Sequence, residues 1–185
     1  MGATRPPVYP DGVIGSEDNV AVVGWNPQWP AVARAEASKL AEVATAVEHV
    51  GSTAVPGMPS RAVVDLLVGL ETFRDSADDV AAAIVEIGFE RVSGTVDDGR
   101  IWLRRVAEPR VYVNVVEFGG ASWKDTVALR DYLRKHPDEA SAYARAKRRA
   151  AEGGPDVITY SQRKRETVEK LTDRARGWRL SHPRG

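Results

Sequence analysis

The sequence predicts an α/β (α+β) fold, in which a mixed β-sheet is flanked by helices and the C-terminal part is helical. Three observations lead to this prediction. Short apolar runs typical of strands lie in the middle of the chain, apolar residues at helical spacing precede and follow them, and Gly, Pro and Asp turns separate the segments. Such mixing is typical of a sheet that helices cover.

The length of 185 residues is sufficient for one domain with its own core. We expect that domain at residues 20–180. Residues 1–19, with their prolines and glycines, are expected to form a flexible arm, and residues 181–185 a frayed tail.

Strands are expected where apolar runs are bounded by turn residues. The predicted strands are 20–25, 47–50, 62–68, 89–93, 101–106 and 111–118. Turns at 97–99 and at Glu108-Pro109 separate the last three of them.

Helices are expected where apolar residues recur every three or four positions. The predicted helices are 27–45, 75–87, 122–135, 137–151 and 161–178. Asn26 and Pro27 suit the start of the first helix, and Gly88 suits the end of the second. Ser122 with Asp125 resembles a capping box at the start of the third.

Charge and composition exclude several classes of protein. Lys and Arg number 26, as do Asp and Glu, and this balance argues against a general nucleic-acid or membrane-surface protein. The absence of cysteine excludes disulfides, thiolate catalysis and Cys-ligated zinc. No segment has the pattern of a secretory signal, and no apolar run approaches the roughly 20 residues that span a membrane. We therefore expect a cytoplasmic protein that binds neither nucleic acid nor membrane, and its oligomeric state stays open.

The residues with candidate chemistry surround a turn between two predicted strands. Gly51 permits backbone dihedrals that a side chain would forbid, and Ser52 and Thr53 add hydroxyl groups. Successive backbone N–H groups in such a turn can form an anion-binding concavity. Asp65 follows within an apolar run, where an unpaired charge is costly, and a metal ion or a cation such as Arg61 would offset that cost.

Glu48 and His49 precede the turn on alternating faces of a strand, so one of them should point into the cleft. The unperturbed pKa of histidine lies near neutrality, which suits proton transfer, although a lone histidine at a strand end more commonly makes a structural hydrogen bond. We take Glu48, His49 and Asp65 as candidate catalytic residues. Arg61 offers a planar guanidinium that can bind phosphate or carboxylate through two hydrogen bonds.

Further substrate-binding candidates lie later in the chain. Tyr112 and Asn114 share one face of a predicted strand, and Glu117 lies on the other face. Arg130 and Lys147, on predicted helices, could supply cations to an anionic ligand. A solvated helix face is the plainer explanation for the basic runs that contain Lys147 and Lys164.

The chain also resembles a known family. The stretch 48–57, Glu-His-Val-Gly-Ser-Thr-Ala-Val-Pro-Gly, is similar to the signature of the GrpB family, a branch of the nucleotidyltransferase-like superfamily. Residues 25–30, 130–137 and 143–147 resemble further motifs of that family, in the family's order.

The resemblance implies a nucleotidyltransferase-like fold, in which the Gly-Ser turn holds a triphosphate and acids on the next strand hold Mg²⁺. Asp65 would then be the metal ligand. The superfamily's second acid is replaced by Leu67, which cannot ligate a metal. Tyr112 and Asn114 likewise replace histidines of a family strand, and neither residue can replace them as a general base near neutral pH.

Three function classes follow. The first is a nucleotidyl- or phosphoryl-transferase-type enzyme that acts on a small molecule or nucleotide, with Mg²⁺ as its candidate cofactor. The second is a metal-independent enzyme of another reaction type that uses the same cleft. The third is a non-catalytic ligand-binding or accessory module, because family members also occur fused to a dephospho-CoA kinase. This chain has no Gly-x-x-x-x-Gly-Lys-Ser/Thr loop of its own.

Overall fold

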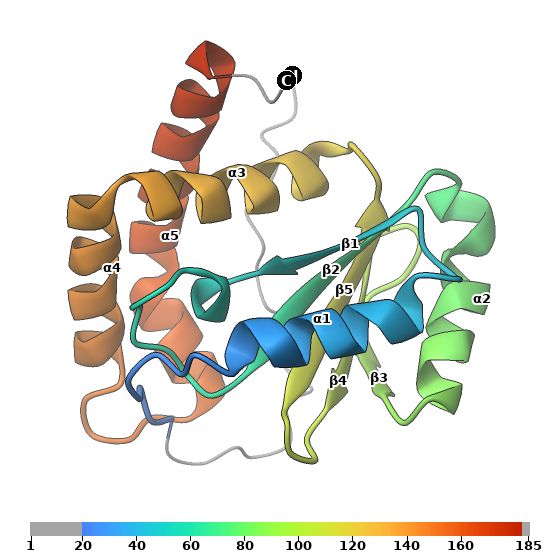
Figure 1. Cartoon of the computed structure of the whole chain (residues 1–185), viewed down its shortest axis with the longest axis horizontal. Helices are drawn as coiled ribbons and strands as arrows, with labels where there is room; N and C mark the ends of the chain where they lie inside the picture. The colour runs from blue at the N-terminus through green and yellow to red at the C-terminus, as the bar shows by residue number, and fades with distance from the viewer. Residues whose placement is uncertain (1–19, 183–185) are drawn as a thin grey trace.

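A computed structural model describes residues 20–182 of the chain (Figure 1). The arm expected at 1–19 and the last tail residues, 183–185, lie outside the described residues. The described chain contains a five-stranded sheet in the order β1-β2-β5-β4-β3. The strands are β1 (Ala46–Val50), β2 (Val64–Leu70), β3 (Glu90–Ser93), β4 (Arg100–Arg105) and β5 (Val111–Glu117). β2 pairs in parallel with β5, and the other pairs are antiparallel, so the predicted mixed sheet is confirmed.

Helices cover both faces of this sheet (Figure 1). They are α1 (Trp29–Leu40), α2 (Phe73–Glu86), α3 (Ala121–Lys135), α4 (Pro137–Ala150) and α5 (Val157–Ser181). α1 and α2 pack against one face, and α3 crosses the other, where it contacts β1 and β5. α4 and α5 pack beside α3, so the C-terminal part is helical as predicted. No helix of residues 20–182 is long and apolar enough to cross a membrane.

The main core lies between the sheet and the first two helices. In β2 the side chains of Val64, Leu66 and Val68 point to this face, and each is at most 1% exposed. Burial of one aliphatic side chain of this size contributes about 1.5–3 kcal/mol, so the sheet is held mainly from this side. The strand pleat sends the alternate residues, Asp65 and Leu67, to the opposite face.

On that opposite face, α3 covers only one end of β2. Gly69 lies directly under the Trp123 ring, and a Cβ at this position would meet ring atoms at 2.7 Å. Leu67 packs with Trp123 in the same apolar cluster. The other end of the face, around Asp65, is not filled by α3.

Several boundaries differ from the predictions for local reasons. Residues 20–25 form only an isolated bridge, Val23 to Ser60, rather than a strand. α1 ends at Leu40, five residues before its predicted end. α5 begins four residues earlier than predicted because Asp156 caps it, and its Oδ1 accepts the Thr159 N–H at 2.9 Å. The predicted capping box is wrong, since α3 starts after Gly120 without a side-chain cap.

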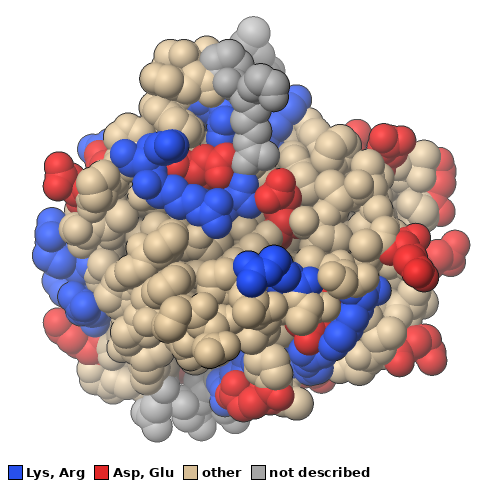
Figure 2. Space-filling view, in the orientation of Figure 1, with Lys and Arg blue, Asp and Glu red and all other residues tan. Residues whose placement is uncertain are grey.

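Charges of both signs are spread over the face of the molecule that Figure 2 shows. On this face, Lys and Arg side chains are interspersed with Asp and Glu around a largely uncharged centre. This distribution agrees with the balanced composition of the chain.

Candidate functional site

A cavity of about 130 Å³ lies where α3 leaves the sheet uncovered. Its floor comes from the sheet, through Val50, Asp65, Leu67 and Asn114, and its walls come from α3, α4 and α5. A smaller hollow of about 60 Å³ adjoins it. The residues common to both are Gly51, Ser52, Asp65, Tyr143, Ser161 and Lys164. We call these two spaces the large lobe and the small lobe.

The Gly51 turn forms one edge of both lobes. Gly51 has φ 69° and ψ −171°, a left-handed conformation that favours glycine. A Cβ on Gly51 would also collide with Oδ2 of Asp65. Residues Ser52–Ala54 then form a short 3₁₀ turn in which the Val55 N–H donates to the Ser52 carbonyl at 3.2 Å. The approach of Asp65 therefore explains why this position is glycine, whether or not a ligand also binds there.

Asp65 is the acid of the site. Its carboxyl faces the lobes and keeps some exposed surface, although protein atoms surround it. Burial raises the pKa of Asp65 to about 6, and the positive charges of Arg61, Lys164 and Lys147 act in the opposite direction. The carboxyl is therefore ionised at neutral pH, and it is more basic than an exposed carboxylate, as a general base requires.

Two lysines add positive charge near Asp65. Burial and the nearby charge of Arg61 lower the pKa of Lys164 to about 8, and Asp65 partly offsets this effect. Burial and the charge of Lys164 lower the pKa of Lys147 to about 7. Lys164 lines both lobes, whereas Lys147 lines neither and lies over the Tyr143 ring, with its Nζ 4.9 Å from the ring centre. Lys147 also donates to the Pro59 carbonyl, so it anchors the loop after the Gly51 turn.

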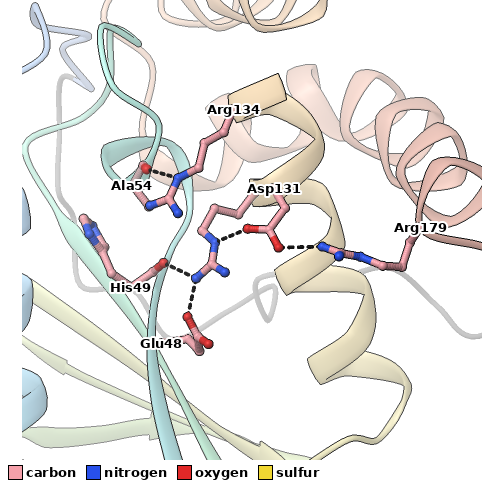
Figure 3. Close-up of polar contacts among 7 residues, drawn as sticks. Glu48, His49, Ala54, Asp131, Arg134 and Arg179 are labelled. Atoms are coloured by element: carbon pink, nitrogen blue, oxygen red, sulfur yellow. Dashed lines mark hydrogen bonds and ion pairs between the residues drawn. The ribbon is translucent and has the colours of Figure 1, made fainter. Parts of the chain in front are cut away.

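Glu48 lies on the same sheet face but is engaged by α3 (Figure 3). Its Oε2 is 2.5 Å from Nη1 of Arg130, which also donates to the His49 carbonyl at 2.9 Å. Nε of Arg130 donates to Asp131, and Asp131 in turn accepts from Arg179 of α5. Glu48 and Arg130 therefore hold β1 against α3 and line neither lobe.

His49 points to the other side of β1. Its Nε2 is 3.0 Å from Oγ1 of Thr53, a buried residue. Burial, followed by the charges of Arg134 and Arg130, lowers the pKa of His49 to about 4. The imidazole is thus neutral at physiological pH, and neither His49 nor Thr53 lines a lobe. His49 therefore makes a structural hydrogen bond with Thr53, the second of the two possibilities that the sequence left open.

The structure brings together part of the predicted site. Of the predicted residues, those that line a lobe are Gly51, Ser52, Arg61, Asp65, Tyr112 and Asn114. Those that line neither are Glu48, His49, Thr53, Glu117, Arg130 and Lys147. Glu117 is exposed at the end of β5.

Sequence reasoning missed the contribution of α5, from which Ser161, Lys164 and Arg165 line the large lobe. A signal was present in the sequence. Lys164 stands four residues after Tyr160 and four before Val168, so it shares the inward face of the helix with these apolar residues. The prediction of a solvated face is therefore wrong for Lys164, which is half-buried.

The donor set does not fit a resident magnesium ion. Residues 20–182 contain no group of three or more His, Cys, Asp or Glu side chains placed to hold a metal. Leu67 follows Asp65 on the same strand face, and the other charged side chains that line the small lobe, Arg61 and Lys164, are cations rather than carboxylates. Asp65 alone cannot form the site that the resemblance implied.

Comparison with known proteins identifies the family of the chain. Residues 19–174 match the family model described as GrpB protein. The chain belongs to the GrpB family. A UPF0157 protein of Pseudomonas aeruginosa is 30% identical over 95% of this chain and 76% of its own length. The glutamate-rich protein GrpB of Alkalihalophilus pseudofirmus is 27% identical over 68% of this chain and 75% of its own.

A solved structure of a GrpB protein supports the fold. The conserved protein GrpB of Enterococcus faecalis superposes with a TM-score of 0.75 at 28% identity, over 85% of this chain and 99% of that one. A dephospho-CoA kinase of Mycolicibacterium paratuberculosis is also 27% identical over 86% of this chain, but the match spans only 46% of that kinase.

The Glu48–Arg130 pair should behave as a buried ion pair. Arg130→Met is expected to lower the free energy of unfolding by roughly 3 kcal/mol, the lower end for a buried pair, because it removes the cation that Glu48 contacts and one of the two arginines that Asp131 contacts. Glu48→Gln should cost less, and the double variant less than the sum of both. Urea unfolding measures each value, and strict additivity would contradict the pairing. Arg174→Met, which removes an exposed partner of Glu139, should cost no more than about 1 kcal/mol.

Gly51 and Gly57 form a matched pair of substitution sites. Both have positive φ, at 69° and 78°, but a Cβ at Gly57 meets no atom within 4 Å. Gly57→Ala should therefore cost only the backbone term of about 1–2 kcal/mol. Gly51→Ala should cost distinctly more in thermal unfolding, and adding Asp65→Ser should recover part of the loss. Equal costs for the two alanines would rule out the contact with Asp65.

Asp65 should make stability depend on pH. Its pKa rises from 3.8 to about 6 on folding, so ionisation opposes folding, and the cost develops as the pH rises from about 4 to 6. Asp65→Asn removes this cost. Relative to the wild type, the variant should gain roughly 1–3 kcal/mol of unfolding free energy between pH 4 and pH 8. Asp79→Asn, at an exposed position of α2, should show no such gain in the same urea series.

Proposed function

We propose that this GrpB-family chain is a small-molecule enzyme of the phosphoryl- or nucleotidyl-transferase type, and that its active site is the pair of lobes below the Gly51 turn. One observation carries the proposal. A single carboxylate, Asp65, lies on the wall common to both lobes together with Lys164, and Arg61 stands beside it in the small lobe. A base next to cations is the arrangement that transfer of a phosphoryl group to a hydroxyl requires.

The roles follow from the chemistry of each group. Arg61 and Lys164 would bind the oxygens of the transferred phosphoryl group, because a guanidinium and an ammonium complement its negative charge. Asp65 would accept the proton of the attacking hydroxyl as its oxygen bonds to phosphorus and the bond to the leaving group breaks. A pKa near 6 suits this role, because the carboxylate is ionised at neutral pH yet more basic than an exposed one.

The related dephospho-CoA kinase gives limited support for a nucleotide-related transferase, since the matched region is less than half of that protein. The same similarity is compatible with an accessory role, in which the matched region binds a ligand without turnover. Loss of ligand binding in a variant would not distinguish a transferase from an accessory module, because both bind a ligand. Steady-state turnover of a substrate would exclude the accessory role.

A second candidate function has its own supporting observation. Leu67 replaces the second acid, and the donor set does not fit a resident magnesium ion. This favours a metal-independent enzyme of another reaction type that uses the same residues to orient its substrate. Dependence of ligand binding on Mg²⁺ separates the two candidates, because a transferase would bind its triphosphate as the magnesium complex.

The experiment is a thermal unfolding series with ATP, GTP, CTP and UTP, each with and without Mg²⁺. A nucleotide at about one hundred times its dissociation constant should stabilise the fold by roughly 2.7 kcal/mol. The proposal predicts a Mg²⁺-dependent stabilisation that Arg61→Gln reduces, because Arg61 binds the phosphoryl oxygens, and that Arg149→Gln, at an exposed position of α4, leaves intact. Stabilisation without Mg²⁺ dependence would favour the second candidate, and no stabilisation by any triphosphate would overturn the transferase assignment.

A further inference from the structure

The two lobes differ in the side chains that line them. Apart from the wall that they have in common, the large lobe has a mainly apolar surface, to which five aliphatic side chains contribute: Val50, Leu67, Leu129, Leu133 and Val168. The polar and charged residues that also line it are Arg100, Asn114, Asp125, Thr126, Arg165, Glu169 and Thr172, and Asp125 is paired with Arg176. The small lobe is bounded by Arg61 and by the rings of Trp102, Tyr112 and Tyr160. One space therefore suits an apolar group, and the other suits a polar, negatively charged group.

The sizes of the lobes restrict what they can hold. The large lobe, at about 130 Å³, is close to the apolar cavity of about 150 Å³ that accepts benzene in an engineered protein. The small lobe, at about 60 Å³, holds a group of a few heavy atoms. A single ring and a phosphate fit one lobe each, and the nucleoside part of a phosphate donor would extend beyond them.

Charge favours an oxyanion in the small lobe. Arg61 and Lys164 bring two positive charges there against the single carboxylate of Asp65. Arg61 lies over the Tyr112 ring, with its Cζ 5.5 Å from the ring centre, so its guanidinium has a defined position. Burial lowers the pKa of Lys164 and the charge of Arg61 lowers it further, and a phosphate bound between the two cations would offset their repulsion. Burial raises the pKa of Tyr160 to about 12, so its hydroxyl keeps its proton at neutral pH.

We propose that the two lobes are subsites for one substrate: a ring-sized apolar alcohol binds in the large lobe, and the phosphate that it receives lies in the small lobe against Arg61 and Lys164. Asp65, on the common wall, faces the point where the alcohol oxygen meets phosphorus. This inference rests on the proposed transfer function and names its acceptor class. The balance is simple: the alcohol O–P bond forms, the bond between that phosphorus and the nucleotide oxygen breaks, and the alcohol proton passes to Asp65.

Binding of small probes tests the inference without turnover. The probes are benzyl phosphate, benzyl alcohol and inorganic phosphate, each titrated by calorimetry into the full chain. The proposal predicts that benzyl phosphate binds more tightly than either fragment. Arg61→Gln should weaken benzyl phosphate and phosphate by about tenfold or more, because a hydrogen bond to a charged group is lost, and it should leave benzyl alcohol unchanged. Arg149→Gln, exposed on α4, is the matched control.

A second variant tests the large lobe. Val168→Phe extends a half-buried side chain of α5 into this space, and it should weaken benzyl alcohol and benzyl phosphate but not inorganic phosphate. Leu129→Phe, from α3, repeats the test if that variant fails to fold, and Val85→Phe, at an exposed position of α2, is the control. Equal loss of all three probes in one variant would overturn the assignment of separate subsites.

Two further outcomes are decisive. Phenylacetate that binds as tightly as benzyl phosphate would overturn the phosphate assignment, because a carboxylate would then suffice. Triphosphate binding without any benzyl phosphate binding would overturn this inference and leave the transferase function standing. If benzyl phosphate binds through both lobes but no phosphoryl group is transferred from a triphosphate, the two subsites stand and the proposed transfer reaction is overturned.

Discussion

The alternation of side chains along β2 determines most of this structure. One face of the strand buries Val64, Leu66 and Val68 against α1 and α2, which supplies much of the stability of the fold. The other face presents Asp65, Leu67 and Gly69 to the C-terminal helices. Because the period of a strand is two residues, the core and the site are fixed by the same register. A slip of one residue would bury the carboxylate in the core and direct leucine to the lobes.

The surroundings of Asp65 explain how a buried acid is tolerated. Its contact with Gly51 requires a residue without a side chain, and the charges of Arg61, Lys164 and Lys147 offset part of the desolvation. The flanks of the turn are held from outside the site, since Arg134 donates to the Ala54 carbonyl at 2.8 Å and Arg130 to that of His49. The carboxylate and the turn are thereby kept in one arrangement before any ligand binds, which lowers the entropy cost of binding.

The sequence was sufficient for the fold and for half of the site. Gly and Pro turns predict strands at 47–50 and 111–118, and the structure has them at Ala46–Val50 and Val111–Glu117. Asp65 stands out because a charge within an apolar run is costly unless it is compensated. The position of Glu48 outside the site does not follow from the sequence. The strand pattern does not show that Arg130, on a distant helix, faces this carboxylate and binds it. Lys164 was missed for a related reason. Its position four residues from Tyr160 indicates a buried helix face. The Gly51 turn, which lines the same lobes, is more than 100 residues away in the sequence, so the pattern does not show that the two lie together.

The site draws on segments that are far apart along the chain, and this has a consequence for how the protein matures. Asp65 and the Gly51 turn belong to the early part of the chain, whereas Lys164 and Ser161 belong to α5. During synthesis the strand that bears the acid leaves the ribosome well before the helix that bears the cation. Until α5 packs, the large lobe lacks one wall and Asp65 lacks the compensating charge of Lys164, so the site is complete only when the last helix is in place.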